Sequence, residues 1–284
     1  MQARALSQIS QTSPSKRLEL LAPGLPKLVE HVLALGVEVQ AMSDAGQHRS
    51  ANIVDNLMQE EAAKLLILLD MVRAGVGNDD VVKKYVRAFY DHLSRCVMAE
   101  VATYRIASFG ELREAVERLR GSHHLDGPND VDWVFRNRLV ATRENAMYVD
   151  YVQTDDGAGW ISPGDDVSPS CGPSRVVDLI ASLSRMGVTT VDGLRLIEGL
   201  WQGCHFEDSD RWEVIRLRNI DTISALREVG LASSEVEGDT NRVIDQWGFP
   251  TAQLDLSKLK IDIDCLRDEQ RAKLEAIERD WYGY

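Results

Sequence analysis

One long segment with apolar residues at helical spacing, from about Gln47 to Arg73, constrains the fold most. Its main apolar stripe consists of Ala51, Val54, Met58, Leu65, Leu69 and Val72. At about 100° per residue these positions fall within one narrow arc, and Ile53, Ile67 and Met71 lie on the opposite side. A helix with apolar residues on two faces is usually central in its fold or shared with a partner chain. We therefore expect this helix to lie at the centre of a bundle or at a dimer interface.

The neighbouring segments predict further helices on both sides of this one. Apolar spacing predicts a helix over about 24–42, and Asn78-Asp79-Asp80 is typical of a helix start because it supplies a cap and negative charge at the N-terminus. The helix that begins there should run to about Ala107, and a shorter one should cover Glu111–Leu119. Helices joined by short connections predict an antiparallel helical bundle.

The helical spacing of apolar residues is lost after Gly121. Alternation at 148–152, the turn residues of 155–159, and Trp160-Ile161 predict a short β-hairpin in an otherwise irregular segment. Helical spacing returns at 176–186, 191–201 and 210–229, and a charged helix is expected at 264–280. We predict a mainly α-helical fold in three parts: a bundle (1–122), the irregular segment with its hairpin (123–172), and a C-terminal helical region (173–284).

Composition bears on location and partners. Hydrophobic residues make up 44% of the chain, but no run of 18 apolar residues occurs and residues 1–17 lack the apolar core of a signal peptide. We expect a cytoplasmic protein with no membrane partner. The formal net charge of −13 counts against a general nucleic-acid binder. The window 71–105 departs from this balance, with six basic residues against four acids.

Neither a metal nor a cofactor is expected. The cysteines Cys96, Cys171, Cys204 and Cys265 are scattered without a C-x-x-C pair. His123-His124 and Cys204-His205 are metal-ligand residue types, but no further ligands follow at useful spacing. Gly-rich phosphate loops and a nucleophile elbow are absent from the sequence.

The pair that suggests chemistry is Arg87 and His92. Their Arg-x-x-x-x-His spacing resembles the signature of HEPN-domain ribonucleases, small helical bundles that cleave RNA through its own 2′-hydroxyl. A histidine titrates near neutral pH and can accept the hydroxyl proton, and an arginine is a forked, permanent cation that fits phosphate oxygens. The same spacing also occurs by chance, and a solvated or salt-bridged pair is the alternative interpretation.

On one continuous helix, Arg87 and His92 would point about 140° apart. One chain therefore presents them poorly. A symmetric homodimer would bring two pairs into one cleft, as HEPN ribonucleases are known to do.

Glu61 is expected to be at least half buried, with Lys64 close enough at i+3 to pair with it. Two interpretations remain open. Glu61 either orients His92 or an arginine, or it forms an intrahelical ion pair between packed helices.

Three segments in order resemble the AbiV family of bacterial abortive-infection proteins. They are Gln59–Leu65, then Phe89–Arg95 with its Phe-x-x-His-x-x-basic pattern, and Arg143–Tyr151 followed by Gly159–Pro163. The resemblance spans about 43–163 and leaves the region after 174 unmatched. It supports His92 more than Arg87, because family members vary at the arginine position.

The resemblance implies an anti-phage protein with a HEPN-like bundle. In the leading interpretation it cuts RNA without metal, with His92 as general acid or base, Arg87 as phosphate clamp, and Glu61, Lys64 and Arg95 in support. An inhibitory or phage-encoded triggering partner is expected, because growth arrest needs restraint. The alternative is a non-catalytic module that senses a phage protein or blocks translation by binding.

Overall fold

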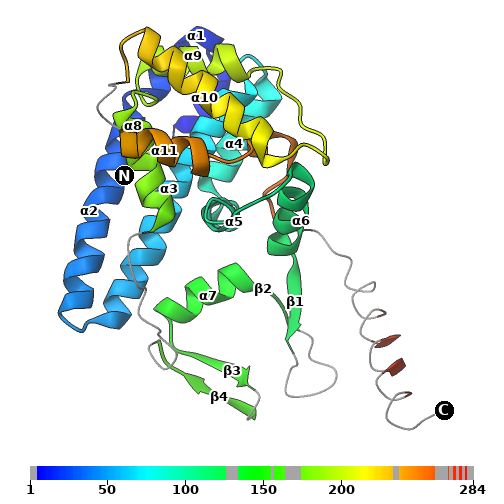
Figure 1. Cartoon of the computed structure of the whole chain (residues 1–284). Helices are drawn as coiled ribbons and strands as arrows, with labels where there is room; N and C mark the ends of the chain where they lie inside the picture. The colour runs from blue at the N-terminus through cyan, green and yellow to red at the C-terminus, as the bar shows by residue number, and fades with distance from the viewer. Residues whose placement is uncertain are drawn as a thin grey trace.

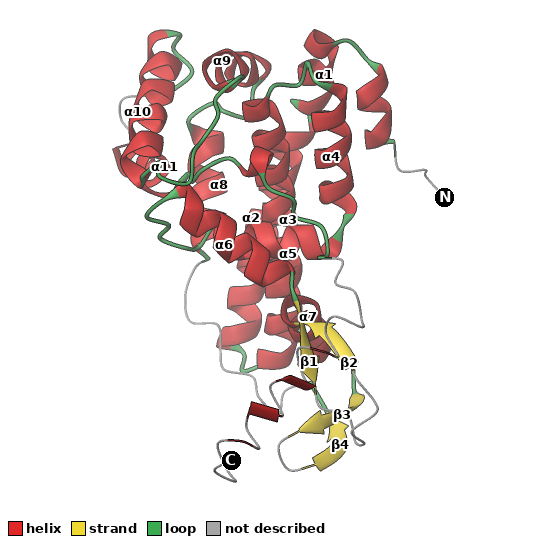
Figure 2. Ribbon diagram, turned by 90° about the vertical axis from the view of Figure 1, so that its right-hand side faces the viewer, coloured by secondary structure: helices red, strands yellow, loops and turns green. Residues whose placement is uncertain are grey.

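The computed structural model describes residues 5–125, 134–154, 157–163, 174–232 and 237–259, and beyond these only residues 268, 271–272, 275–276 and 279. In chain order the elements are η1 (Leu6–Gln11), α1 (Pro14–Leu21), α2 (Gly24–Asp44), α3 (His48–Ala74), α4 (Asp79–Tyr90), α5 (His92–Val101), α6 (Phe109–Arg120), β1 (Ser122–Leu125), β2 (Val134–Asn137), α7 (Arg138–Met147), β3 (Asp150–Thr154), β4 (Gly157–Ile161), α8 (Arg175–Arg185), α9 (Val191–Trp201), α10 (Trp212–Glu228), α11 (Glu237–Gln246) and η2 (Thr251–Gln253). Helices form the body, and the described strands lie at one end of it (Figures 1 and 2). The predicted mainly α-helical fold is confirmed.

Helix α2 lies along one side of the body and forms a hairpin with α3 (Figure 1). The inward face of α2 carries Leu25, Val29, Val32 and Leu35, spaced at three and four residues and all buried. The hairpin turns at Gly46, whose φ of 71° lies in the left-handed region that favours glycine. Both predicted helices are confirmed to within two residues of their predicted ends.

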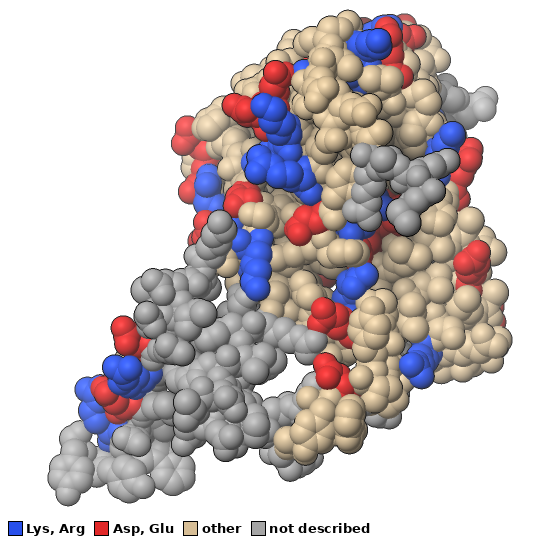
Figure 3. Space-filling model, turned by 180° about the vertical axis from the view of Figure 1, so that it is seen from behind, with Lys and Arg blue, Asp and Glu red and all other residues tan. Residues whose placement is uncertain are grey.

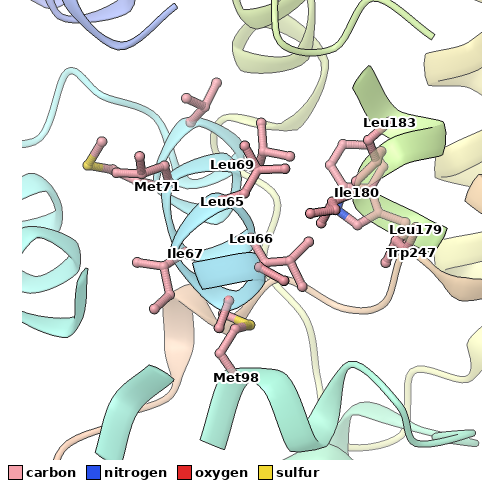
Figure 4. Packing of buried hydrophobic residues seen from close by; sticks show 14 of the residues in the cluster. Leu65, Leu66, Ile67, Leu69, Met71, Met98, Leu179, Ile180, Leu183 and Trp247 are labelled. Atoms are coloured by element: carbon pink, nitrogen blue, oxygen red, sulfur yellow. The ribbon is translucent and has the colours of Figure 1, made fainter. Parts of the chain in front are cut away.

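Helix α3 is the centre of the fold. It contacts α2, α4, α5, α7, α8 and α9. Figure 4 shows Leu66 and Leu69 on the side that faces Ile180 of α8, whereas Ile67 and Met71 point the other way. Burying each such side chain contributes about 1.5–3 kcal/mol. The two-faced apolar pattern therefore reflects a helix surrounded by its own chain.

The C-terminal helices pack on the same core. Helices α8 and α9 both contact α3, and their buried residues belong to one hydrophobic cluster with those of α3. The Arg73 guanidinium of α3 lies 3.9 Å from the Trp201 ring centroid and 4.5 Å from that of Trp247. Asp70 completes the link, because it pairs with Arg73 at 3.1 Å and accepts hydrogen bonds from the backbone and hydroxyl of Thr251.

The predicted hairpin is present as the antiparallel pair β3–β4, in which Tyr151 is opposite Trp160. The rest of the segment 123–172 was predicted to be irregular, but helix α7 and nearly all of a second antiparallel pair, β1–β2, lie within it. Asn137 begins α7 by accepting hydrogen bonds from the backbone of Leu139 and Val140. Helix α7 contacts α3 and α5, which places it beside the core bundle.

Some helices were not predicted, namely α1, α7 and α11. They are short, and α7 and α11 hold few buried residues, so their apolar spacing is weak. The charged helix expected at 264–280 lies largely outside the described residues, and the described ones within it (268, 271–272, 275–276 and 279) are helical.

The segment 14–44, which holds α1 and α2, is long and apolar enough to cross a membrane by length and composition alone. A third of its most apolar window is buried inside the fold (33%). Its buried residues pack against α3 and α8, as expected for a helix of a bundle core.

Candidate functional site

The prediction of one helix from Asn78 to about Ala107 was wrong, because the chain breaks at Asp91. Asp91 has extended backbone (φ −86°, ψ 124°), ends α4 and caps α5. Its carboxylate accepts hydrogen bonds from the Ser94 backbone at 2.8 Å and the Ser94 hydroxyl at 2.7 Å. Arg87 and His92 therefore lie on different helices, and the angle expected for one continuous helix does not apply.

His92 occupies the first position of α5 and contacts a buried carboxylate. Its Nδ1 atom lies 2.9 Å from Oε2 of Glu60, on the central helix α3. The Glu60 side chain is 6% exposed, whereas that of His92 is 55% exposed. A fixed, buried acid thus holds one ring nitrogen of an imidazole whose other edge faces solvent.

Two guanidinium groups flank this pair. Arg95, one turn along α5, approaches Oε2 of Glu60 at 3.2 Å and Nδ1 of His92 at 2.8 Å. Arg143 of α7 donates from Nε to Oε1 of Glu60 at 2.6 Å. Two permanent cations around one carboxylate leave a local positive excess, which is the charge that a phosphate oxygen requires.

The tautomer of His92 determines which neighbour its Nδ1 atom bonds. Nδ1 cannot donate to Glu60 and accept from Arg95 at the same time, because a ring nitrogen has one such role. In the neutral tautomer with the proton on Nδ1, the ring donates to Glu60, whereas in the other neutral tautomer Nδ1 accepts from Arg95. In the first tautomer the lone pair lies on Nε2, which makes no hydrogen bond to the described part of the chain.

Arg87 lies apart from this cluster. It is exposed on α4, where Nε donates to the Lys83 carbonyl at 3.4 Å. With Lys84 it lines a cavity of about 330 Å³ that the C-terminal segment 251–257 closes on its other side. The structure does not bring Arg87 into contact with His92 within the described part of one chain.

Glu61 and Lys64 form an ion pair within α3. The Lys64 ammonium also lies 5.4 Å from the centroid of the Phe89 ring. The carboxylate that contacts His92 comes from the adjacent residue, Glu60. Of the residues singled out in the sequence, the structure brings together His92 with Arg95 and, separately, Glu61 with Lys64.

Sequence reasoning missed Glu60 and Arg143. Both lay within the segments that carry the AbiV resemblance, and that was the available signal. Glu60 and Glu61 are both largely buried on α3. Only the positions of α5 and α7 determine which of the two contacts His92.

Within the described residues, no group of three or more His, Cys, Asp or Glu side chains is arranged to hold a metal ion. Near the Cys204-His205 pair, the Cys204 thiol donates to the Leu200 carbonyl and His205 lies 3.4 Å from the side-chain nitrogen of Gln253. The side chains of His123 and His124 lie outside the described part. Charged residues of both signs are interspersed over the face in Figure 3.

A family model for AbiV proteins of the HEPN type matches residues 22–174, just over half of the chain. The chain belongs to the AbiV family. No curated protein and no solved structure shows a significant match. The matched range contains α2 to α7, and therefore Glu60, His92, Arg95 and Arg143. AbiV membership indicates an abortive-infection, anti-phage function carried by a HEPN-type domain.

Proposed function

We propose that this AbiV protein is a metal-independent endoribonuclease that acts in the cytoplasm and arrests translation in the infected cell. The observation that carries the proposal is the Glu60–His92 hydrogen bond, flanked by the guanidinium groups of Arg95 and Arg143. A carboxylate that orients an imidazole is the arrangement by which proteins make a histidine an effective base.

The proposed reaction is transfer of a phosphodiester within RNA. Nε2 of His92 takes the proton of a 2′-hydroxyl, and the 2′-oxygen attacks the adjacent phosphorus. The bond from phosphorus to the 5′-oxygen then breaks, and that oxygen leaves with a proton. The products are a 2′,3′-cyclic phosphate and a 5′-hydroxyl, with no change in oxidation state.

Arginine would stabilise the negative charge of the phosphorane. Arg143 is the nearer candidate, because it contacts Glu60 while about a quarter of its side chain is exposed (26%). Arg87 lies on the far side of the helix break and would act on a neighbouring phosphate. A symmetric homodimer would add a second histidine as the acid that protonates the leaving oxygen.

The decisive experiment compares the wild type with His92→Ala for cleavage of total RNA in EDTA. We expect discrete fragments with 2′,3′-cyclic phosphate ends from the wild type, and at least a 100-fold slower reaction from the variant. His31→Ala, which removes an exposed histidine of α2, is the matched control and should cleave normally. Equal cleavage by wild type and His92→Ala would rule out the proposed mechanism.

One observation favours a second function, binding without catalysis. The β3–β4 hairpin exposes an aromatic pair, Tyr151 and Trp160, whose ring centroids are 5.3 Å apart, and the Trp160 residue is 74% exposed. An exposed aromatic pair is typical of a surface that receives a protein partner, such as a phage trigger or an inhibitor. Growth arrest that persists in His92→Ala cells, with intact RNA, would select this function.

A further inference from the structure

A second cavity adjoins the His92 site. It has a volume of about 290 Å³ and lies between α3, α5 and α7. Glu60 belongs to its lining as well as to the histidine cluster, so the two sites share a wall. The volume is close to the lower end of the range for small-ligand pockets, about 300–1,000 Å³, and suits one nucleobase rather than an oligonucleotide.

The cavity is placed for a nucleotide next to the scissile bond. The first residue of α5 that lines the cavity is Cys96, which follows His92 by one turn, or four residues, on the same face of the helix. One such turn corresponds to about 6 Å along the helix axis. A phosphate that reaches Nε2 of His92 would therefore have an adjacent base within reach of the cavity.

The polar lining favours a ligand with N–H donors. Carboxylates come from Asp55 on α3 and Glu100 on α5, and Asn56 and Gln59 add side-chain amides to the lining. Burial raises the pKa of Asp55, and its hydrogen bond with Gln59 only partly offsets that effect. A carboxylate that is desolvated but poorly paired gains from further donors.

The rim of the cavity adds a cation and an apolar surface. Arg138 of α7 lies 3.7 Å from Glu100 and is largely exposed, so its guanidinium can turn toward a ligand. Ala99 and Leu139 supply apolar contacts on facing helices. A phosphate would meet more negative than positive charge here, whereas a neutral base would not be repelled.

We propose that this cavity binds a guanine base of the RNA and so directs where the chain is cut. Guanine alone among the four RNA bases offers two adjacent N–H donors on one edge, which match the two oxygens of a carboxylate. On another edge it offers the O6 and N7 acceptors that arginine recognises. The inference rests on the proposed ribonuclease function for its role, but the binding itself can be measured without cleavage.

The test uses uncharged nucleosides and the full chain. Binding of guanosine, adenosine, cytidine and uridine is compared by ligand-observed NMR for the wild type and for Asp55→Asn. We expect guanosine to bind best, and Asp55→Asn to weaken it about tenfold. Asp44→Asn is the matched control, because Asp44 also pairs with a glutamine four residues away but lies outside the cavity. It should leave guanosine binding unchanged.

Sequencing of the RNA ends supplies a second readout. The wild type should show a guanine preference at one position beside the cut, and Asp55→Asn should relax it while cleavage continues. Failure of all four nucleosides to bind the wild type, or equal binding that Asp55→Asn does not alter, overturns the inference whether or not RNA is cut. Guanosine binding by a protein that cuts no RNA would instead support the cavity and reject the ribonuclease.

Discussion

Nδ1 of His92 lies 2.9 Å from Oε2 of Glu60, across the contact between α5 and α3. Glu60 cannot move far, because Arg143 holds its other oxygen at 2.6 Å and the side chain is buried. The imidazole is therefore fixed at one nitrogen and open at the other. The proposed role of His92 as a base rests on this asymmetry.

Exchange of Glu60 for glutamine should inactivate the protein without unfolding it. The amide can present N–H toward Nδ1, which holds the imidazole in the opposite tautomer and removes the free base at Nε2. We expect RNA cleavage to fall about 100-fold or more. The melting temperature should also fall, because Arg95 and Arg143 lose their anionic partner, so cleavage is compared at temperatures where both proteins are folded. Rates of fragment formation at several pH values, together with thermal melts, check this.

Glu61→Gln is the control for this experiment, since Glu61 is the neighbouring residue and pairs with Lys64. It should retain nearly full activity. Equal losses in both variants would mean that Glu60 has no special relation to His92.

Loss of the Asp70 carboxylate should destabilise the whole protein. Asp70→Ala leaves the Arg73 guanidinium buried without its ionic partner, which costs about 3–5 kcal/mol. The midpoint of urea unfolding measures the change. Asp80→Ala, which breaks the exposed pair with Lys83, should cost less than about 0.5 kcal/mol. Similar midpoints for the two variants would contradict a structural role for the buried pair.

The Cys96 thiol should be almost inert at neutral pH. Burial, followed by the nearby Glu60 carboxylate, raises its pKa to about 12. Because only the thiolate reacts, alkylation at pH 8 should be roughly a thousandfold slower than for a free cysteine. Peptide mass spectrometry after iodoacetamide treatment measures it, with the urea-unfolded chain as the reactive reference. Rapid labelling in the folded state would show that α5 and α7 do not enclose this position.

The free energy of unfolding should depend on pH, through Asp239, at pH values below the ordinary pKa of an aspartate. Hydrogen bonds from Arg185, then from Ser182, lower the pKa of Asp239 from 3.8 in the folded state. Its stabilising contribution is therefore complete above 3.8 and is lost as pH falls through the lower folded value. Asp239→Asn should cost about 1–2 kcal/mol at pH 7. The difference in urea midpoint from wild type should shrink toward pH 3, and a pH-independent difference would contradict the assignment.

Apolar spacing predicted the long helices well, because α2 and α3 each bury a continuous stripe. It did not predict the break at Asp91. Val86, Phe89, Leu93 and Val97 continue one apolar stripe across the break, so one extended residue between two helices leaves the periodicity almost unchanged. The only local indication of the break was Asp91 itself. It lies three residues before Ser94, which is the spacing of a residue that caps a helix N-terminus.

His92 could be found from the sequence because it lies within a recognisable pattern of residue types. Glu60 could not be distinguished from Glu61, since the choice depends on the rotation of α3 relative to α5 and α7. Arg143 is 83 residues from Glu60 in sequence, so only the fold brings them together.

The contact of the Arg73 guanidinium with both Trp201 and Trp247 has a consequence for the family as well as for stability. Arg73 belongs to the segment that matches the AbiV family, and both tryptophans lie after it. An AbiV chain that ended near residue 174 would expose this cation and the apolar side of the central helix together. AbiV chains without the C-terminal helices should therefore have another side chain at the position of Arg73. In chains that have these helices, the arginine and the two tryptophans should occur together.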